Sequence, residues 1–204
     1  MVNLHMLVLG NLQTNCYVVW DETSSSCVVV DPAAEPAKIL EFVSTKGLTI
    51  EAIFLTHGHF DHVGAVEALR KATGCGLCLH KGDYHLRPNP TVDFLFPLHD
   101  KELGEISFCD EGDVICAAGL KFTVYSTPGH SRGSVCYRAE KVLLSGDTLF
   151  AGGCGRTDLP GGDPEVIFMS LADLSELGDD ITVYPGHGES TTLAREKRYN
   201  PSMR

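Results

Sequence analysis

The chain has 204 residues, 43% hydrophobic and 21% charged, a composition that is typical of folded globular proteins and excludes a disordered one. Its formal net charge of −11 disfavours nucleic acid and anionic membranes as partners, because affinity for nucleic acid comes largely from neutralised phosphates. No apolar run approaches the roughly 20 residues that span a bilayer, and residues 1–10 carry no Lys or Arg ahead of their apolar stretch, unlike a signal peptide. We therefore predict a cytoplasmic protein with one domain over residues 1–204.

Short apolar runs that predict strands alternate with a few helical patterns. Strands are predicted at residues 4–9, 16–20, 27–30, 50–55, 77–79, 114–117, 120–125, 134–137, 142–144 and 181–184. Helices are predicted at residues 37–45 and 63–71, from Pro164 to residue 177, and from a cap at Ser190 to Lys197. Residues 85–110 show no sustained period and predict a long ordered loop. Many strands with few helices indicate two sheets packed face to face with helices outside, an α/β architecture.

The eight cysteines do not resemble a disulfide framework. Cys16, Cys27 and Cys136 lie inside apolar strand-like runs, where a free cysteine behaves as a small buried hydrophobe. Cys75 and Cys78 form a C-x-x-C pair, which can hold zinc or act as a redox pair, but no second pair and no thioredoxin-like context accompany it. We interpret these thiols as strand-packing residues.

Residues 57–62 read HGHFDH and follow a predicted strand, so three imidazoles and a carboxylate crowd one strand-to-helix loop. Burying these groups without partners costs free energy, and a solvated turn rarely has this composition. His and Asp are ligands that zinc prefers, and His57 and His59, one residue apart on an extended loop, can face one ion. Asp61 and His62, where the helix begins, can face a neighbouring ion. A chance His-rich surface loop is the less favoured alternative.

Three later ligand-type residues, His130, Asp147 and His187, each follow a glycine just after a predicted strand. Taken singly, each would be interpreted as an ordinary turn residue. Their common context, behind a loop with four candidate ligands, indicates that they complete the same site. The other histidines are interpreted as structural or exposed, and they are His5, His80, His85 and His99.

The order H-x-H-x-D-H, followed by His, Asp and His at successive strand ends, resembles the metallo-β-lactamase superfamily over nearly the whole chain. The resemblance implies a four-layer αβ/βα sandwich, two mixed sheets with helices outside, and two divalent metal ions at one edge. It assigns His57, His59 and His130 to one ion and Asp61, His62 and His187 to the other, with Asp147 bridging both. Zinc is the expected metal, and iron or manganese suits the same ligands.

The segment from Asp147 to Arg156 resembles glyoxalase II and the related hydroxyacylglutathione hydrolases, because the zinc β-lactamases commonly have a cysteine in place of this aspartate. The resemblance implies hydrolysis of a small acyl-thioester such as S-lactoylglutathione by a metal-bridging hydroxide, and it disfavours β-lactamase activity. A thiolate departs with little help from an acid, because a thiol has a pKa near ~8.5. Asp61 and metal-bound water are the candidates for acid–base catalysis, and Arg156 is a candidate contact for a substrate carboxylate or a plain surface residue.

Two departures from glyoxalase II keep other functions open. The chain lacks the C-terminal helical segment by which the longer enzymes contact glutathione, and Asp158 stands where they have a tyrosine. Residues 155–163 look more like the short bacterial glyoxalase II-like hydrolases, and they also resemble persulfide dioxygenases, whose single iron would be held here by His57, His130 and Asp147. A non-catalytic metal-binding protein is the third alternative, and it requires a broken ligand set, whereas every ligand position is filled.

Overall fold

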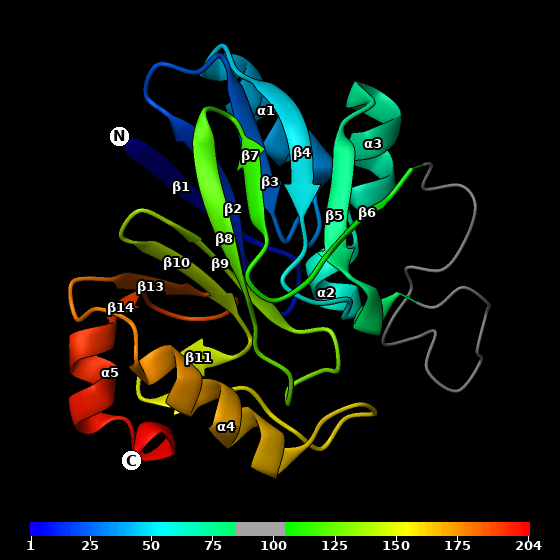
Figure 1. Cartoon of the computed structure of the whole chain (residues 1–204). Coiled ribbons are helices and arrows are strands. Elements are labelled where there is room, and N and C mark those ends of the chain that lie inside the picture. The colour runs from blue at the N-terminus through cyan, green and yellow to red at the C-terminus, as the bar shows by residue number, and fades with distance from the viewer. Residues whose placement is uncertain (85–104) are drawn as a thin grey trace.

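The computed structural model describes residues 1–84 and 105–204, in which two β-sheets pack face to face between two layers of helices (Figure 1). The first sheet contains, in order across it, β1 (Val2–Leu9), β2 (Thr14–Asp21), β3 (Ser26–Val30), β4 (Thr49–Phe54), β5 (Gly76–His80) and β6 (Ser107–Cys109). The second contains β14 (Thr191–Thr192), β13 (Thr182–Pro185), β10 (Val142–Gly146), β9 (Val135–Ala139), β8 (Leu120–Ser126) and β7 (Val114–Ala117). A separate ribbon pairs β11 (Leu149–Phe150) with β12 (Gly153–Cys154).

Both sheets are mixed. In the first sheet, β1, β2 and β3 pair antiparallel and β3, β4, β5 and β6 pair parallel. In the second sheet, β10 and β13 pair parallel and the other neighbours pair antiparallel. Parallel neighbours need crossover connections, and the helices α1 (Pro36–Thr45) and α3 (Val66–Thr73) supply two of them in the first sheet.

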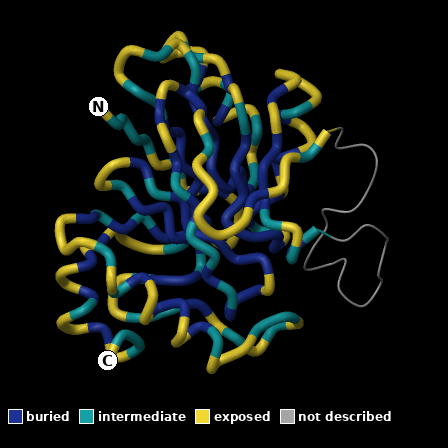
Figure 2. Tube along the Cα trace, viewed as in Figure 1, coloured by how far each residue is buried: buried dark blue, intermediate teal, exposed yellow. Residues whose placement is uncertain are grey.

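The helices are α1 (Pro36–Thr45), α2 (Phe60–Val63), α3 (Val66–Thr73), α4 (Pro164–Ser175) and α5 (Leu193–Tyr199). Apolar side chains of α1 and α3 pack on the outer face of the first sheet, and those of α4 and α5 on the outer face of the second. A third apolar cluster fills the space between the sheets, where Phe54 contacts Phe122 and Tyr137, and Figure 2 shows this buried interior. The predicted four-layer αβ/βα architecture is confirmed.

No helix in residues 1–84 and 105–204 is long and apolar enough to cross a bilayer.

Two predicted helices differ from the observed ones. The helix predicted at residues 63–71 is divided into α2 and α3, because the N–H of Ala65 donates to the carbonyl of Pro32 at 2.8 Å and a Cβ at Gly64 would lie 2.3 Å from the carbonyl oxygen of Ala33. The last helix begins after Thr192, whose hydroxyl accepts a hydrogen bond from the N–H of Arg195. The predicted cap at Ser190 is therefore wrong, and the short strand β14 lies between Ser190 and the helix.

The loop predicted at residues 85–110 is only partly described. Its end forms the edge strand β6, which pairs parallel with β5, so the prediction of loop there is wrong. Residues 85–104, and with them His85 and His99, lie outside the described residues. Of the other two histidines interpreted as structural or exposed, His5 stacks on Phe42 with ring centroids 3.9 Å apart, and His80 accepts a hydrogen bond from the N–H of Gly82.

The cysteines of the C-x-x-C pair pack on opposite faces of the first sheet. Cys75 belongs to the cluster beneath α1 and α3, and Cys78 belongs to the cluster between the sheets. Both are buried free thiols, which confirms their interpretation as packing residues.

Candidate metal centre

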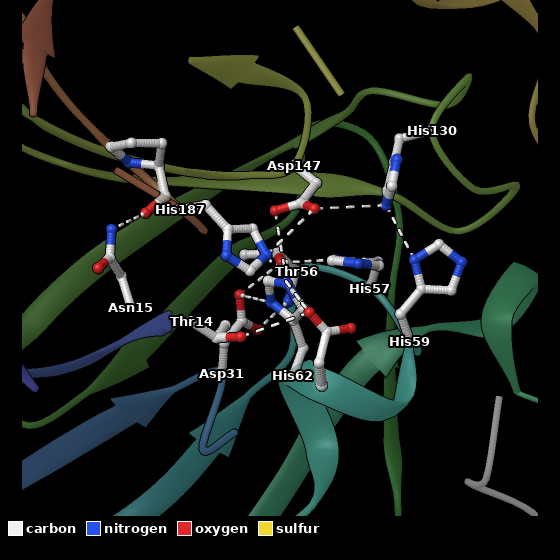
Figure 3. A network of polar contacts seen from close by, with 12 residues as sticks. Thr14, Asn15, Asp31, Thr56, His57, His59, His62, His130, Asp147 and His187 are labelled. Atoms are coloured by element: carbon white, nitrogen blue, oxygen red, sulfur yellow. Dashed lines mark hydrogen bonds and ion pairs between the residues drawn. The ribbon is translucent and has the colours of Figure 1, made fainter. Parts of the chain in front are cut away.

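The seven predicted ligands lie together at the edge where the two sheets meet, and Figure 3 labels all of them except Asp61. Four come from the loop after β4 and from α2, and one each comes from the loops after β8, β10 and β13. Ligand atoms of His57, His59 and His130 lie within 4.8 Å of one another, and so do those of Asp61, His62 and His187. The two sets that the sequence assigned to two separate ions are therefore both assembled.

Backbone contacts join the two sheets at this edge. The N–H of Val135, at the start of β9, donates to the carbonyl of Thr56 at 2.8 Å. The hydroxyl of Tyr137 donates to the carbonyl of Leu55 at 2.9 Å. The ligand loop after β4 is consequently held by the second sheet as well as by its own.

Asp31, directly after β3, orients two of the imidazoles. Its buried carboxylate accepts hydrogen bonds from the Thr56 N–H at 2.8 Å, from the Thr56 hydroxyl at 2.6 Å and from Nδ1 of His62 at 3.0 Å. Because the single hydroxyl proton of Thr56 goes to Asp31, Nδ1 of His57 must donate in its 3.1 Å contact with that hydroxyl. Nε2 is therefore the nitrogen that both histidines can offer to a metal.

His130 is oriented in the same way by the backbone. Its Nδ1 lies 2.8 Å from the carbonyl oxygen of Arg156 and donates to it, which leaves Nε2 available. That Nε2 lies 2.8 Å from Nδ1 of His59. Two ligands bound at ~2.1 Å to a tetrahedral ion are about 3.4 Å apart, so these two nitrogens face one another and would have to separate slightly to bind one ion.

Asp147 lies between the two ligand sets. Its Oδ2 is 3.6 Å from Nε2 of His130 and 3.6 Å from Nε2 of His187, and its Oδ1 is 3.4 Å from Nε2 of His62. The close approach requires glycine on the neighbouring loop, because a Cβ at Gly186 would lie 2.2 Å from Oδ1 of Asp147. Asp147 thus lies within reach of both candidate ligand sets.

Three buried polar atoms of this centre have no hydrogen-bond partner among the described residues, namely Nε2 of His57, Nε2 of His62 and Oδ1 of Asp147. Leaving such an atom unsatisfied costs about 1–3 kcal/mol, and most buried polar groups in proteins are paired. Imidazole nitrogen and carboxylate oxygen are ligands for divalent transition metals. The donor set therefore fits divalent metal ions.

Burial keeps the first set of histidines neutral. It lowers the pKa of His57 well below its usual range and lowers the pKa of His59 to about 3. It also lowers the pKa of His130, although Asp147 opposes the shift. Neutral imidazole is the form that binds a metal, so these three side chains need not lose a proton first.

In the second set, neighbouring carboxylates raise the pKa of both histidines. Burial acts to lower the pKa of His62, but Asp147 and Asp31 outweigh it, and the net shift is upward. The hydrogen bond with Asp61 raises the pKa of His187. Burial acts to raise the pKa of Asp61 itself, yet the contacts with His187 and His62 hold it at about 2. Carboxylates that attract protons to their neighbours attract a divalent cation for the same reason.

Arg156 is exposed, and its guanidinium is already paired. Its Nε and one terminal nitrogen each donate to a different carboxylate oxygen of Asp158, both at 2.7 Å. A substrate carboxylate would have to displace Asp158 from this bidentate pair. The backbone of Arg156, rather than its side chain, contacts the centre, through the carbonyl that orients His130.

Three polar residues that frame the centre were not singled out as site residues by the sequence. Asp31 and Asn15 are each 1% exposed, as is Asp83, and all three hold ligand-bearing loops. A polar residue beside an apolar strand was the signal for each of them. That signal is weak, because such residues are also typical of ordinary turns.

The family comparison agrees with this geometry. The family model described as the metallo-beta-lactamase superfamily matches residues 9–187. The chain belongs to this superfamily. The superfamily binds divalent metals, and the His and Asp clusters at the sheet edge fit such ions.

Several members of the superfamily match nearly the whole chain. The hydroxyacylglutathione hydrolase GloC of Haemophilus influenzae is 33% identical over 99% of this chain and 98% of its own length. The solved B3 metallo-β-lactamase BLEG-1 is 34% identical, with a TM-score of 0.88 over 98% of each chain. ETHE1 from Myxococcus xanthus is 30% identical, with a TM-score of 0.84 over 98% of this chain and 83% of that one. TTHA1623, solved in a di-iron-bound form, is 38% identical, with a TM-score of 0.81 over 97% of this chain and 98% of that one.

Removing one ligand of the second set should lower the metal content towards one ion per chain. We expect the unaltered protein to hold two metals and the His187→Ala variant to hold close to one, because His57, His59 and His130 do not touch the lost ring. Elemental analysis after gel filtration measures this ratio. His5→Ala is the matched control, because this histidine lies in β1 and stacks on Phe42 of α1. It should keep two ions. An unchanged ratio in His187→Ala would remove this residue from the ligand set.

Proposed function

We propose that the protein is a binuclear metal hydrolase that cleaves a small acyl-thioester, such as S-lactoylglutathione. One observation carries the proposal: the second ligand set, Asp61, His62 and His187, is complete and shares Asp147 with the first. The similarity to a hydroxyacylglutathione hydrolase along the whole chain supports the same reaction class.

The chain's residues have separate tasks in this reaction. One ion would be held by His57, His59 and His130. The other would be held by Asp61, His62 and His187, and Asp147 would contact both ions. When bound, the two ions would lower the pKa of a shared water towards neutrality and offer positive charge to the developing oxyanion. Asp31 and the Arg156 carbonyl keep three of the rings in the ligand tautomer throughout the cycle. Zinc is the metal we propose, although the solved di-iron form of TTHA1623 shows that a similar chain can hold iron.

The leaving group favours a thioester over an amide. A thiolate departs readily because a thiol has a pKa near ~8.5, whereas an amide nitrogen requires a proton donor. Asp61, the acid–base candidate, has its pKa held at about 2, so it is a carboxylate at neutral pH and can accept a proton but not donate one. We assign Asp61 the roles of metal ligand and proton acceptor, accepting in addition a hydrogen bond from Thr14 at 3.4 Å.

Persulfide dioxygenase activity is the second candidate, and the similarity to ETHE1 of Myxococcus xanthus favours it. In that case His57, His130 and Asp147 would hold a single iron. His57 and His130 belong to one candidate ligand cluster, and Asp147 lies 3.6 Å from His130, so these contacts are compatible with this assignment too. The candidates differ in what the second ligand set does, because a mononuclear enzyme does not need it.

We further propose a small-molecule substrate and a cytoplasmic location. The eight cysteines are free thiols, which is typical of proteins in a reducing compartment. Cell fractionation of the producing organism, with antibody detection, tests the location.

The direct test of the proposal is an assay of S-lactoylglutathione hydrolysis by the zinc-loaded protein, in which the release of free thiol is measured. A β-lactam such as nitrocefin belongs in the same assay, because BLEG-1 is a B3 metallo-β-lactamase of very similar fold. We expect thiol release and little β-lactam cleavage. Cleavage of nitrocefin without thioesterase activity would overturn the proposed substrate class.

Arg156→Ala should raise KM more than it lowers kcat, the pattern for an interaction made equally with substrate and transition state. The ion pair with Asp158 supplies a paired variant: Asp158→Ala releases the guanidinium and should lower KM for an anionic thioester. Steady-state kinetics on S-lactoylglutathione measure both. If KM is the same in all three proteins, Arg156 does not contact substrate.

A further inference from the structure

The loop that carries His187 is held by a buried asparagine. The side-chain amide of Asn15, in β2, donates to the carbonyls of Pro185 and Gly188, both at 2.9 Å, and these residues flank His187 in the chain. Figure 3 shows Asn15 near His187. The backbone N–H of Asn15 donates to the carbonyl of Gly186 at 2.7 Å. Asn15 therefore fixes the backbone on both sides of His187.

The loops that carry the first ligand set are held by a buried aspartate. The carboxylate of Asp83 accepts from the N–H of Gly58 at 2.9 Å, from the hydroxyl of Ser131 at 2.6 Å and from the N–H of Gly133 at 2.7 Å. Gly58 stands between His57 and His59, while Ser131 and Gly133 follow His130. Asp83 thus ties together the two loops that supply all three histidines of the first set.

The two residues act on different ligand sets. In the contacts described above, Asn15 touches only the loop of His187, and Asp83 touches only the loops of His57, His59 and His130. They share no hydrogen-bond partner. Contributions from sites without shared partners are usually additive.

We propose that Asn15 and Asp83 are positioning residues, one for each metal site, so that each site can be weakened while the other keeps its affinity. The inference rests on the pair of metal sites proposed above. Outer partners that orient metal ligands typically change metal affinity by 10–100-fold when they are mutated. Loss of either residue should therefore lower the affinity for one of the two zinc ions by roughly that factor.

The test isolates the first site by working in the His187→Ala background, in which one zinc ion per chain should remain. Zinc affinity is measured by competition with a chromophoric chelator, and the unfolding temperature of the metal-free protein is measured beside it. Asp83→Asn, which turns one acceptor oxygen into a donor, should lower the affinity for the remaining zinc ion about 10–100-fold. Asn15→Ala should leave the affinity for that zinc ion unchanged in this background. In the otherwise unaltered protein it should lower the affinity for one of the two zinc ions.

Tyr17→Phe is the matched control for Asn15. The Tyr17 hydroxyl donates to the same Pro185 carbonyl at 2.6 Å, but Tyr17 does not reach Gly188 on the other side of His187. Tyr17→Phe should lower the unfolding temperature and keep both zinc affinities. If Asn15→Ala does not fold, Asn15→Ser replaces it with the same expectation.

The outcomes separate the inference from the function on which it rests. Equal weakening of the remaining zinc by Asp83→Asn and by Asn15→Ala in the His187→Ala background would show a general loss of structure and overturn the inference. So would an unchanged zinc affinity in Asp83→Asn. Fewer than two zinc ions bound by the unaltered protein would instead overturn the proposed pair of metal sites, and two zinc ions still bound by His187→Ala would remove His187 from the ligand set.

Discussion

Asp147→Ala is expected to reduce thioester hydrolysis by about 10³-fold or more and to lower the content of both metals. The carboxylate, 11% exposed, lies between the two ligand sets, with its oxygens 3.4–3.6 Å from ring nitrogens of both. Without it, two divalent ions roughly 3.5–4 Å apart lose the anion that offsets their repulsion. A loss of ~4 kcal/mol of transition-state stabilisation corresponds to about 10³-fold in rate. Elemental analysis and steady-state kinetics on the same preparation measure the two effects.

Two further variants show whether the effect belongs to the bridging position. Asp147→Asn keeps the shape and one acceptor oxygen, so it should retain more metal than Asp147→Ala. Asp180→Ala removes an exposed aspartate that pairs with Lys141 at 2.8 Å on the surface, and it should change neither metal content nor rate. If Asp147→Ala kept two metals and lost only activity, the residue would act on the substrate and not as a bridge.

The zinc-loaded protein is expected to cleave S-lactoylglutathione in the absence of oxygen, and the iron-loaded protein is expected to consume no oxygen with glutathione persulfide. A hydrolase requires only a metal-activated water, so zinc as the sole metal suffices. A persulfide dioxygenase requires a metal that changes its redox state, and zinc cannot do so. With zinc as the sole metal, hydrolysis should remain and persulfide dioxygenase activity should be absent. The expected difference between the two activities is therefore all or none.

Oxygen uptake that follows iron content, with no thiol release by the zinc form, would overturn the hydrolase proposal. His62→Ala sharpens the comparison, because it removes a ligand that the mononuclear assignment does not use. A hydrolase should lose most of its rate in this variant, whereas a dioxygenase should keep its iron on His57, His130 and Asp147. Anaerobic thiol assays and an oxygen electrode give the two readouts.

The strand pattern and the ligand loop were predictable because both depend on neighbours in the chain. Apolar runs such as residues 27–30 and 142–144 correspond to β3 and β10 within a residue or two. The edge strand β6 was not predictable, because its three residues are ordered by pairing with β5, about 30 positions earlier in the chain, and not by a pattern of their own. The division between α2 and α3 likewise depends on a hydrogen bond to Pro32 in another loop.

The candidate ligands could be named from the sequence alone, because the type of side chain sets which metals it can bind, and the spacing H-x-H-x-D-H acts over a single loop. Only the tertiary structure decided which ring nitrogen His57, His62 and His130 can offer, since Asp31 and the Arg156 carbonyl come from other strands and loops. It also decided that the Arg156 side chain is already held by Asp158. The contact of Asn15 with Pro185 joins residues 170 positions apart, and no local pattern predicts a hydrogen bond that forms only when two sheets pack together.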